Sequence, residues 1–272
     1  MLFRSREGWG RRVRDSSTVE ACFAWPTPLG GLGGGPKGGH MPRKTRAVLF
    51  DLDDTLYPQC RFLFSGFAAV AGHLEKRWGV HGGCAFRLLM TSYHNDRGHE
   101  LDRLVEQLHL AESVASLVTV IREHTPSLTL QPATVRTLRA LRRSWQLAIV
   151  TNGVPAMQRA KVAALGVDHL VHTVVYATEH GSGAGKPEPG PFLVALRRLD
   201  VPAAQAIFVG DDEAADIFGA TQCGIRAIHM LQWKRAATAS ISAQGDAHVH
   251  RIVDVPAVAD SLLSRRRTHY AA

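Results

Sequence analysis

The sequence predicts an α/β fold, a doubly wound parallel sheet with a Rossmann-like core and an α-helical insertion. Three short apolar runs, at residues 47–50, 147–150 and 206–209, each end in a polar cluster. Buried parallel strands have this pattern when they end at a site. Helical and strand patterns then alternate along the second half of the chain, as they do in sheets covered by helices on both faces.

Each element follows from its local pattern. Between the first two runs, apolar residues recur three and four positions apart, which predicts helices with one buried face. Pro155 favours a helix start and Gly166 a helix end. In chain order we expect a strand at 47–50, helices around 62–78, 88–89, 101–108 and 114–121, a helix at 132–143, a strand at 147–150, a helix at 155–165, a strand at 172–176, a helix at 189–199, strands at 206–209, 226–230 and 252–255, and a helix at 258–263.

The two ends of the chain differ in composition from the middle. Residues 29–39 read LGGLGGGPKGG, which is typical of a flexible linker. We therefore expect residues 1–40 to be a disordered extension or the product of an upstream start codon; acidic residues argue against a transit peptide. The predicted divisions are a core at 41–58 and 128–265, a helical insertion at 59–127 and a basic tail at 266–272. Arg265, Arg266 and Arg267 are expected to be solvated, with contact to nucleic acid or anionic lipid as the alternative.

Composition narrows the class of protein. The chain has 272 residues, 45% of them hydrophobic, which is enough for one large or two modest domains. No apolar run is long enough to span a membrane. The four cysteines, Cys22, Cys60, Cys84 and Cys223, form no Cys-x-x-Cys pair, so we expect reduced thiols in a cytoplasmic protein. The sequence says nothing of the oligomeric state.

The polar residues that follow the predicted strands indicate a phosphate and metal site. Ligands of open α/β sheets lie beyond the carboxyl ends of the strands, so these residues should meet in one crevice. Asp51, Asp53 and Asp211 offer hard oxygen ligands that suit Mg²⁺. A carboxylate beside a metal ion and a lysine can act as a nucleophile. The Thr151 hydroxyl and the turn after it can hold phosphate oxygens, and Lys186 can offset the crowded negative charge.

These residues also carry a resemblance to a known family. Phe50-Asp51-Leu52-Asp53-Asp54-Thr55-Leu56-Tyr57, Thr151-Asn152-Gly153, Gly185-Lys186-Pro187, and Val209-Gly210-Asp211 with Asp216-Ile217 and Gly219-Ala220 occur in this order. In this, the chain resembles the haloacid dehalogenase superfamily of phosphohydrolases over roughly residues 46–230. Each motif alone is a weak signal, but the ordered set with its spacing is a strong one.

The resemblance implies a role for each matching position. Asp51 would be the nucleophile, and Asp53 the general acid and then the base. Thr151, with the backbone at Asn152 and Gly153, would hold the phosphoryl group, and Lys186 would balance its charge. The metal set would be Asp51, Asp53 through its backbone carbonyl, and Asp211, with support from Asp216. Asp212 stands where the family often has Ser or Asn, which leaves open which acidic residue contacts the metal.

The resemblance favours a phosphatase among the activities of the superfamily. Members that break carbon–halogen bonds lack the second aspartate, which is Asp53 here, and mutases typically have Gly where this chain has Asp54. We expect a Mg²⁺-dependent hydrolase of a small phosphorylated metabolite, a nucleoside monophosphate or a sugar phosphate. A 2-haloacid dehalogenase and a non-catalytic binding module are the alternatives.

The resemblance implies that the helical insertion at 59–127 is an inserted α-helical cap domain. Residues in and near this predicted cap are candidates for selecting the substrate. Tyr57 and Arg61 follow the first motif, and Tyr93, Arg97 and His99 surround the middle of the predicted cap. Arg is a natural partner for a second anionic group on the substrate, and Tyr could stack on a base or sugar. The alternative is that these side chains lie on the surface and contact nothing. No nucleic-acid partner is expected.

Overall fold

The computed structural model describes residues 45–233 and 245–264, and these residues belong to one compact unit. The predictions for residues 1–40, for Cys22 and for the basic tail from Arg265 onward lie outside the described residues. The domain boundaries predicted above stay predictions.

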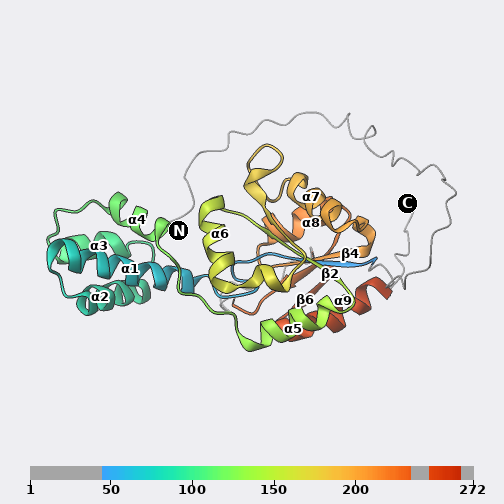
Figure 1. Cartoon of the computed structure of the whole chain (residues 1–272), viewed down its shortest axis with the longest axis horizontal. Coiled ribbons are helices and arrows are strands. Elements are labelled where there is room, and N and C mark those ends of the chain that lie inside the picture. The colour runs from blue at the N-terminus through green and yellow to red at the C-terminus, as the bar shows by residue number, and fades with distance from the viewer. Residues whose placement is uncertain (1–44, 234–244, 265–272) are drawn as a thin grey trace, which may run out of the picture. The chain divides into compact units, whose positions relative to one another are not determined.

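The centre of the fold is a sheet of six strands, all paired in parallel (Figure 1). Its order is β3-β2-β1-β4-β5-β6. The strands are β1 (Ala47–Phe50), β2 (Gln146–Thr151), β3 (Thr173–Tyr176), β4 (Ala206–Gly210), β5 (Arg226–Met230) and β6 (Ala247–Val249). The chain runs outward from β1 to β3 and then from β4 to β6 on the other side. The order therefore reverses between β1 and β4, where open parallel sheets place their ligands.

Alternate residues of the strands face opposite sides of the sheet and build two apolar cores. Val48 and Phe50 belong to one core cluster, and Ala47 and Leu49 belong to the other. The first cluster receives the helices α5 (Pro132–Arg142), α6 (Pro155–Leu165) and α9 (Val255–Ser264), and the second receives α7 (Pro189–Leu199) and α8 (Gly219–Gln222). In Figure 1, α7 and α8 lie on one side of the sheet, and α5 and α9 lie on the other. The predicted doubly wound parallel sheet is confirmed.

One predicted element is wrong. Residues 252–255, expected to form an edge strand, instead form a 3₁₀ turn (Ile252–Asp254) that leads into α9. Ile252 and Val255 are both buried, three positions apart, which is helical spacing. The edge strand is β6, whose short sequence Ala-His-Val carries too little apolar alternation to be recognised.

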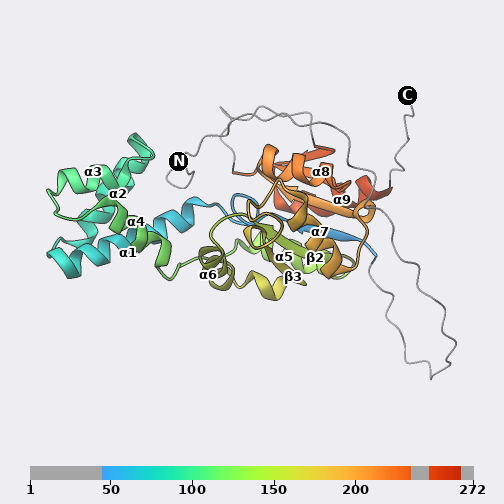
Figure 2. The same cartoon turned by 90° about the horizontal axis from the view of Figure 1, so that it is seen from above.

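Four helices lie between β1 and α5. They are α1 (Cys60–Trp78), α2 (Gly82–Asn95), α3 (Glu100–Gln107) and α4 (Val114–Glu123), and both views show them grouped together (Figures 1 and 2). Their buried side chains include Phe67, Leu89, Leu104 and Ile121. The helices α1 and α4 approach closely at Gly66, where an added Cβ would lie 2.8 Å from Ile121 Cγ2.

Two further properties concern the chain's surroundings. Among the described residues, no helix is both long enough and apolar enough to cross a membrane. Cys60, Cys84 and Cys223 are free thiols. The cytoplasmic location expected from the sequence stays a prediction.

A buried carboxylate stabilises the helical insertion. Glu112, in the connection between α3 and α4, has a side chain that is 6% exposed. It accepts a hydrogen bond from Trp78 Nε1 at 3.0 Å and pairs with Arg77 at 3.1 Å and His73 at 3.3 Å. Hydrogen bonds from Ser116 and Trp78 lower the pKa of Glu112 to about 2.

We expect Glu112→Gln to lower the free energy of unfolding by about 1–3 kcal/mol at pH 7, because the donors around this buried side chain lose a charged acceptor. The pKa of Glu112 is lower in the folded state than in the unfolded chain, so this stabilisation is present above the ordinary pKa of 4.5. It is lost as the pH falls from there toward 2. Urea unfolding of wild type and Glu112→Gln from pH 7 to pH 3 would measure the difference between their free energies of unfolding.

The matched control is Glu106→Gln, because Glu106 pairs with Arg103 on an exposed part of α3 with 69% of its side chain accessible. Exposed pairs of this kind contribute about 0–1 kcal/mol. A gap between wild type and Glu112→Gln that stays constant down to pH 3 would contradict the stabilising role of the Glu112 carboxylate.

Candidate active site

The carboxyl ends of β1, β2 and β4 bring the predicted site residues to one edge of the sheet. The register pairs Phe50 with Ile149 on β2 and with Val209 on β4, so the three strands end level with one another. Asp51 continues the pairing, because its backbone N–H donates to the carbonyl of Val209 at 2.9 Å. Thr151 is the last residue of β2, and Asp211 follows β4.

A tight turn after β1 presents the second aspartate. The backbone N–H of Asp54 donates to the carbonyl of Tyr57 at 2.9 Å, and that of Leu56 donates to Leu52 at 3.0 Å. Asp54 has a φ of 53°, in the left-handed region that Asp tolerates better than most residues. Its side chain accepts from the backbone of Gln59 at 2.8 Å, which connects the turn to the start of α1.

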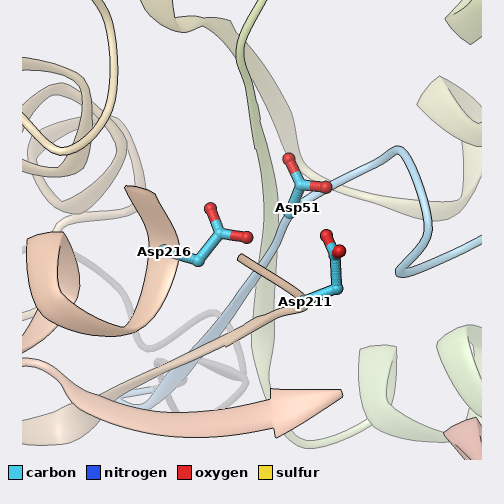
Figure 3. Close-up of side chains that lie close together, drawn as sticks. All are labelled: Asp51, Asp211 and Asp216. Atoms are coloured by element: carbon cyan, nitrogen blue, oxygen red, sulfur yellow. The ribbon is translucent and has the colours of Figure 1, made fainter. Parts of the chain in front are cut away.

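Three carboxylates meet at this edge. Ligand oxygens of Asp51, Asp211 and Asp216 all lie within 4.8 Å of one another, and Figure 3 shows the three carboxylates directed toward a common space. Asp216 comes from a π-helical turn (Glu213–Phe218) directly after β4. Three carboxylates at this separation suit a hard divalent cation such as Mg²⁺. The donor set therefore fits the metal that the sequence predicts.

Neighbouring groups hold this cluster in place. Asp212 caps the π-helical turn, because its Oδ1 accepts from the backbone N–H groups of Ala214 and Ala215 at 2.9 Å each. His229 Nε2, from β5, donates to the carbonyl of Asp211 at 3.0 Å. The carboxylate of Asp212 is thus engaged in capping, whereas that of Asp216 belongs to the three-carboxylate cluster.

Lys186 is the cation of the cluster. Its Nζ lies 2.6 Å from Asp51 Oδ1 and 2.7 Å from Asp216 Oδ1, and its side chain is 2% exposed. Asn152 fixes the loop that carries it: the Asn152 side chain accepts from the Lys186 N–H at 2.8 Å and donates to the Lys186 carbonyl at 2.9 Å. Gly185, with φ of 80°, allows this approach, since a Cβ there would lie 2.6 Å from Asn152 Oδ1.

Burial and neighbouring charges shift the pKa values of Asp51 and Lys186 in opposite directions. Burial raises the pKa of Asp51 above its ordinary value, Lys186 lowers it, and the negative charges of Asp216 and Asp53 raise it further. For Lys186, burial favours the neutral amine, but the two aspartates outweigh it and raise the pKa. Lys186 is therefore charged, and it is the positive group that allows Asp51 to ionise at this buried position.

Asp53 has an environment of its own. Lys161 Nζ lies 2.9 Å from Asp53 Oδ1 and 2.8 Å from Oδ2. Tyr57 donates its hydroxyl to Oδ1 at 2.5 Å, and Gln158 Nε2 donates to Oδ2 at 2.9 Å. Burial favours the neutral acid, but Lys161 and the hydrogen bonds outweigh it and lower the pKa of Asp53.

Sequence reasoning missed Lys161 and Gln158. Both lie on α6, three positions apart, and both side chains are buried on the face that also carries Val162 and Leu165. A buried lysine needs a charged partner. The sequence did contain a signal for them: Gln158 and Lys161 are polar residues at helical spacing on the otherwise apolar face of α6 that packs on the sheet.

The remaining predicted residues lie as follows. Thr151 is 1% exposed, and its Oγ1 accepts from Gln158 Nε2 at 2.5 Å. Gly153 has a φ of 123°, which only glycine adopts readily. Tyr57, predicted as a substrate contact, is 1% exposed, and its hydroxyl donates a hydrogen bond to Asp53. Arg61 is exposed in the first turn of α1.

The candidate cap residues occupy the end of α2 and the segment after it. The Arg97 guanidinium lies 4.2 Å from the centre of the Tyr93 ring and hydrogen-bonds the Tyr93 hydroxyl. The Tyr93 ring packs edge-on against Phe64, with 5.0 Å between the ring centres. His99 pairs with Asp96 at 3.3 Å. Tyr93 and Arg97 thus form one preorganised aromatic and cationic unit.

Comparison with known proteins shows the family of this chain and agrees with its fold. The haloacid dehalogenase-like hydrolase family model matches residues 45–224, so this chain belongs to that family of hydrolases. A glyceraldehyde 3-phosphate phosphatase of Methanopyrus kandleri is 31% identical over 206 residues, which cover 70% of this chain and 85% of the relative. A ribulose-1,5-bisphosphate 5-phosphatase of Halopiger xanaduensis is 30% identical over 209 residues, covering 67% and 83%.

Solved structures share the architecture. A 2-haloacid dehalogenase of Pseudomonas syringae pv. Tomato superposes with a TM-score of 0.52 and 26% identity, covering 80% of this chain and 99% of the other. The same architecture therefore carries different chemistry in different members of the family. Function has to be argued from the site residues.

The close approach of β4 to Asp216 gives a test of the site's construction. A Cβ at Gly210 would lie 2.3 Å from Asp216 Oδ2, so we expect Gly210→Ala to displace the Asp216 carboxylate. Overpacking of this kind costs about 1–3 kcal/mol, and the melting temperature should fall. The control is Gly72→Ala, where a Cβ meets nothing within 4 Å. Equal melting temperatures for Gly210→Ala and wild type would contradict the close approach.

Proposed function

We propose that this protein is a Mg²⁺-dependent phosphatase that hydrolyses small phosphomonoesters through an aspartyl-phosphate intermediate. One observation carries the proposal. The Asp51 carboxylate is held 2.6 Å from Lys186 and within the Asp211 and Asp216 cluster, while a separately bound carboxylate, Asp53, lies two residues further on. One aspartate is therefore arranged as a nucleophile and the other as an acid and base.

Asp51, Asp211 and Asp216 would hold the metal ion, with the backbone carbonyl of Asp53 as the ligand that the family resemblance adds. When bound, Mg²⁺ would supply positive charge against the phosphate oxygens and the nucleophile. Lys186 supplies the second positive charge, because its ammonium contacts Asp51 Oδ1. Thr151 would offer its hydroxyl, and Asn152 and Gly153 their backbone N–H groups, to the phosphoryl oxygens.

The reaction would have two displacements. In the first, Asp53 starts protonated, having taken up a proton from solvent when the negative charge of the substrate phosphate comes to lie beside it. An Asp51 oxygen forms a bond to phosphorus, the phosphorus–oxygen bond to the alcohol breaks, and Asp53 gives its proton to the leaving oxygen. In the second, Asp53 takes a proton from water, the water oxygen bonds to phosphorus, and the bond to Asp51 breaks. Inorganic phosphate leaves, and both aspartates return to their starting states. General acid–base help of this kind contributes about 10²–10⁴-fold.

We place a sugar phosphate ahead of a nucleoside monophosphate as the substrate. Two relatives that share most of their length with this chain are named as phosphatases of glyceraldehyde 3-phosphate and of ribulose 1,5-bisphosphate. Arg97, stacked on Tyr93, is the candidate for contact with a further polar or anionic group of the substrate.

A 2-haloacid dehalogenase is the second candidate, favoured by the superposition with a dehalogenase structure. A halide leaves without a proton, so that reaction has no use for an acid at Asp53. In this protein Asp53 is held by Lys161, Tyr57 and Gln158, which supports the phosphatase. A non-catalytic binding module is disfavoured, because every residue that the chemistry needs is present.

We expect Asp51→Asn to abolish phosphate release from any phosphomonoester that the wild-type chain hydrolyses, because an amide is not a nucleophile toward phosphorus. The purified full chain would be assayed for inorganic phosphate with Mg²⁺ present, and circular dichroism would confirm folding. Asp102→Asn on the exposed side of α3 is the control and should keep wild-type rates. An active Asp51→Asn protein would refute the proposed nucleophile.

Removal of divalent metal should also stop the reaction. We expect EDTA to eliminate phosphate release and added Mg²⁺ to restore it, because the Asp51, Asp211 and Asp216 cluster then regains its cation. A panel of sugar phosphates, nucleoside monophosphates and phosphorylated amino acids would rank the substrates. Halide release from a 2-haloacid, without phosphate release from any ester, would favour the dehalogenase instead.

A further inference from the structure

We infer that Lys161 and Gln158 of α6 are positioning residues that hold Asp53 for its role as acid and base and couple it to Thr151. The inference rests on the proposed function. It starts from the contacts of the Asp53 carboxylate. Its two oxygens accept hydrogen bonds from Lys161, Tyr57 and Gln158. A carboxylate with this many donors has one favoured orientation.

Lys161 makes the charged contact. Its Nζ lies within 2.9 Å of both Asp53 oxygens, and its side chain is 2% exposed. The aromatic ring of Phe62, in the first turn of α1, covers the ammonium, with 4.6 Å between Nζ and the ring centre. A buried cation keeps a fixed position only when a partner of opposite charge is at hand. Asp53 and Lys161 therefore fix each other.

Gln158 makes the connection to the phosphate side of the site. Its Nε2 lies 2.9 Å from Asp53 Oδ2, 2.5 Å from Thr151 Oγ1 and 2.8 Å from the carbonyl of Asn152. Two amide protons thus serve three acceptors. Gln158 Oε1, in contrast, is buried with no hydrogen-bond partner among the described residues. A buried acceptor without a partner is unfavourable, so the orientation of this amide is set by its donor side.

The contact with Thr151 has a chemical consequence. When Gln158 donates to Thr151 Oγ1, the hydroxyl proton of Thr151 is directed away from Gln158. It can then be donated to a phosphoryl oxygen. The same amide thus orients the acid that serves the leaving group and the hydroxyl that holds the phosphate.

The leaving group distinguishes a positioning role from a merely structural one. A sugar alkoxide needs a proton as it leaves, whereas 4-nitrophenolate leaves readily without one. A displacement of about 1 Å in a catalytic group can cost about 10²-fold. We expect Lys161→Met to lower kcat/KM for the best sugar phosphate of the panel by about 10–100-fold, and kcat/KM for 4-nitrophenyl phosphate by less than about threefold, because kcat/KM reports only the steps up to formation of the aspartyl-phosphate. Gln158→Leu should show the same preference on top of a loss common to both esters, because it also removes the donor to Thr151 Oγ1.

The experiment measures kcat and KM of the full chain on both esters with saturating Mg²⁺. Arg159→Met is the matched control, because Arg159 lies on the same helix but pairs with Glu179 on the exposed side. Tyr57→Phe is the substitute if Lys161→Met does not fold, because it removes one hydrogen bond to Asp53 and keeps the buried ring. It should shift the ratio of the two rates in the same direction.

A double variant completes the test. If Lys161 acts through Asp53, then Lys161→Met should add little to Asp53→Asn on the sugar phosphate, because residues that act as one unit are not additive. Equal losses on both esters, or fully additive losses in the double variant, would overturn the inference while leaving the phosphatase intact. A wild-type chain that hydrolyses neither ester would instead overturn the proposed function, and the acid role of Asp53 with it.

Discussion

The contact of the Lys186 ammonium with two buried aspartates is the interaction on which the site depends. Asp51 and Asp216 each lie within 2.7 Å of Lys186 Nζ, and all three side chains are nearly inaccessible to water. Two carboxylates this close would repel each other strongly in a site of low dielectric. Removing one partner of such a buried pair costs about 3–5 kcal/mol, because the remaining charge is left uncompensated. The amine reaches the end of β1 because the loop before α7 is held there. The Asn152 side chain bonds to the Lys186 backbone, and Gly185 permits that close approach.

A second lysine separates the two aspartates of the first motif. Asp51 and Asp53 are two residues apart, yet Asp51 contacts Lys186 and Asp53 contacts Lys161. The tight turn at Asp54 makes this division possible, because it directs the two side chains to different partners. As a result, the pKa of Asp51 is raised by burial, whereas the pKa of Asp53 is lowered by Lys161. Asp53 is therefore ionised in the free site, and its proposed role as acid requires the negative charge of the bound phosphate to raise its pKa.

The sequence was sufficient for the parts of the site that are encoded locally. The apolar strands β1, β2 and β4 end in Asp51, Thr151 and Asp211, and the parallel register makes these ends coincide. Lys161 and Gln158 could not be placed in this way, because their contacts are not local in the sequence. Their shared partner Asp53 lies more than a hundred residues earlier, and Thr151, the second partner of Gln158, lies on the preceding strand. The side-chain pairs depend on how α6 rotates against the sheet. The edge strand β6 was missed for another reason. It has only three residues, one of them His248, which is too short for an alternation of apolar and polar residues to be recognised.

In the proposed function, chemistry and selectivity come from different parts of the chain. The residues that would act on phosphorus follow β1, β2 and β4 or lie in the loop before α7, whereas Tyr93 and Arg97 belong to the end of α2 and the turn after it. Phe62 is a point of contact between these parts, because it starts α1 and its ring covers the ammonium that binds Asp53. The first turn of the helical insertion is therefore packed against the lysine that binds the proposed acid. Under the proposed function, changes at the end of α2 would alter which ester is accepted without disturbing Asp51. Changes at Phe62 would act on Lys161 and hence on the proton transfer itself.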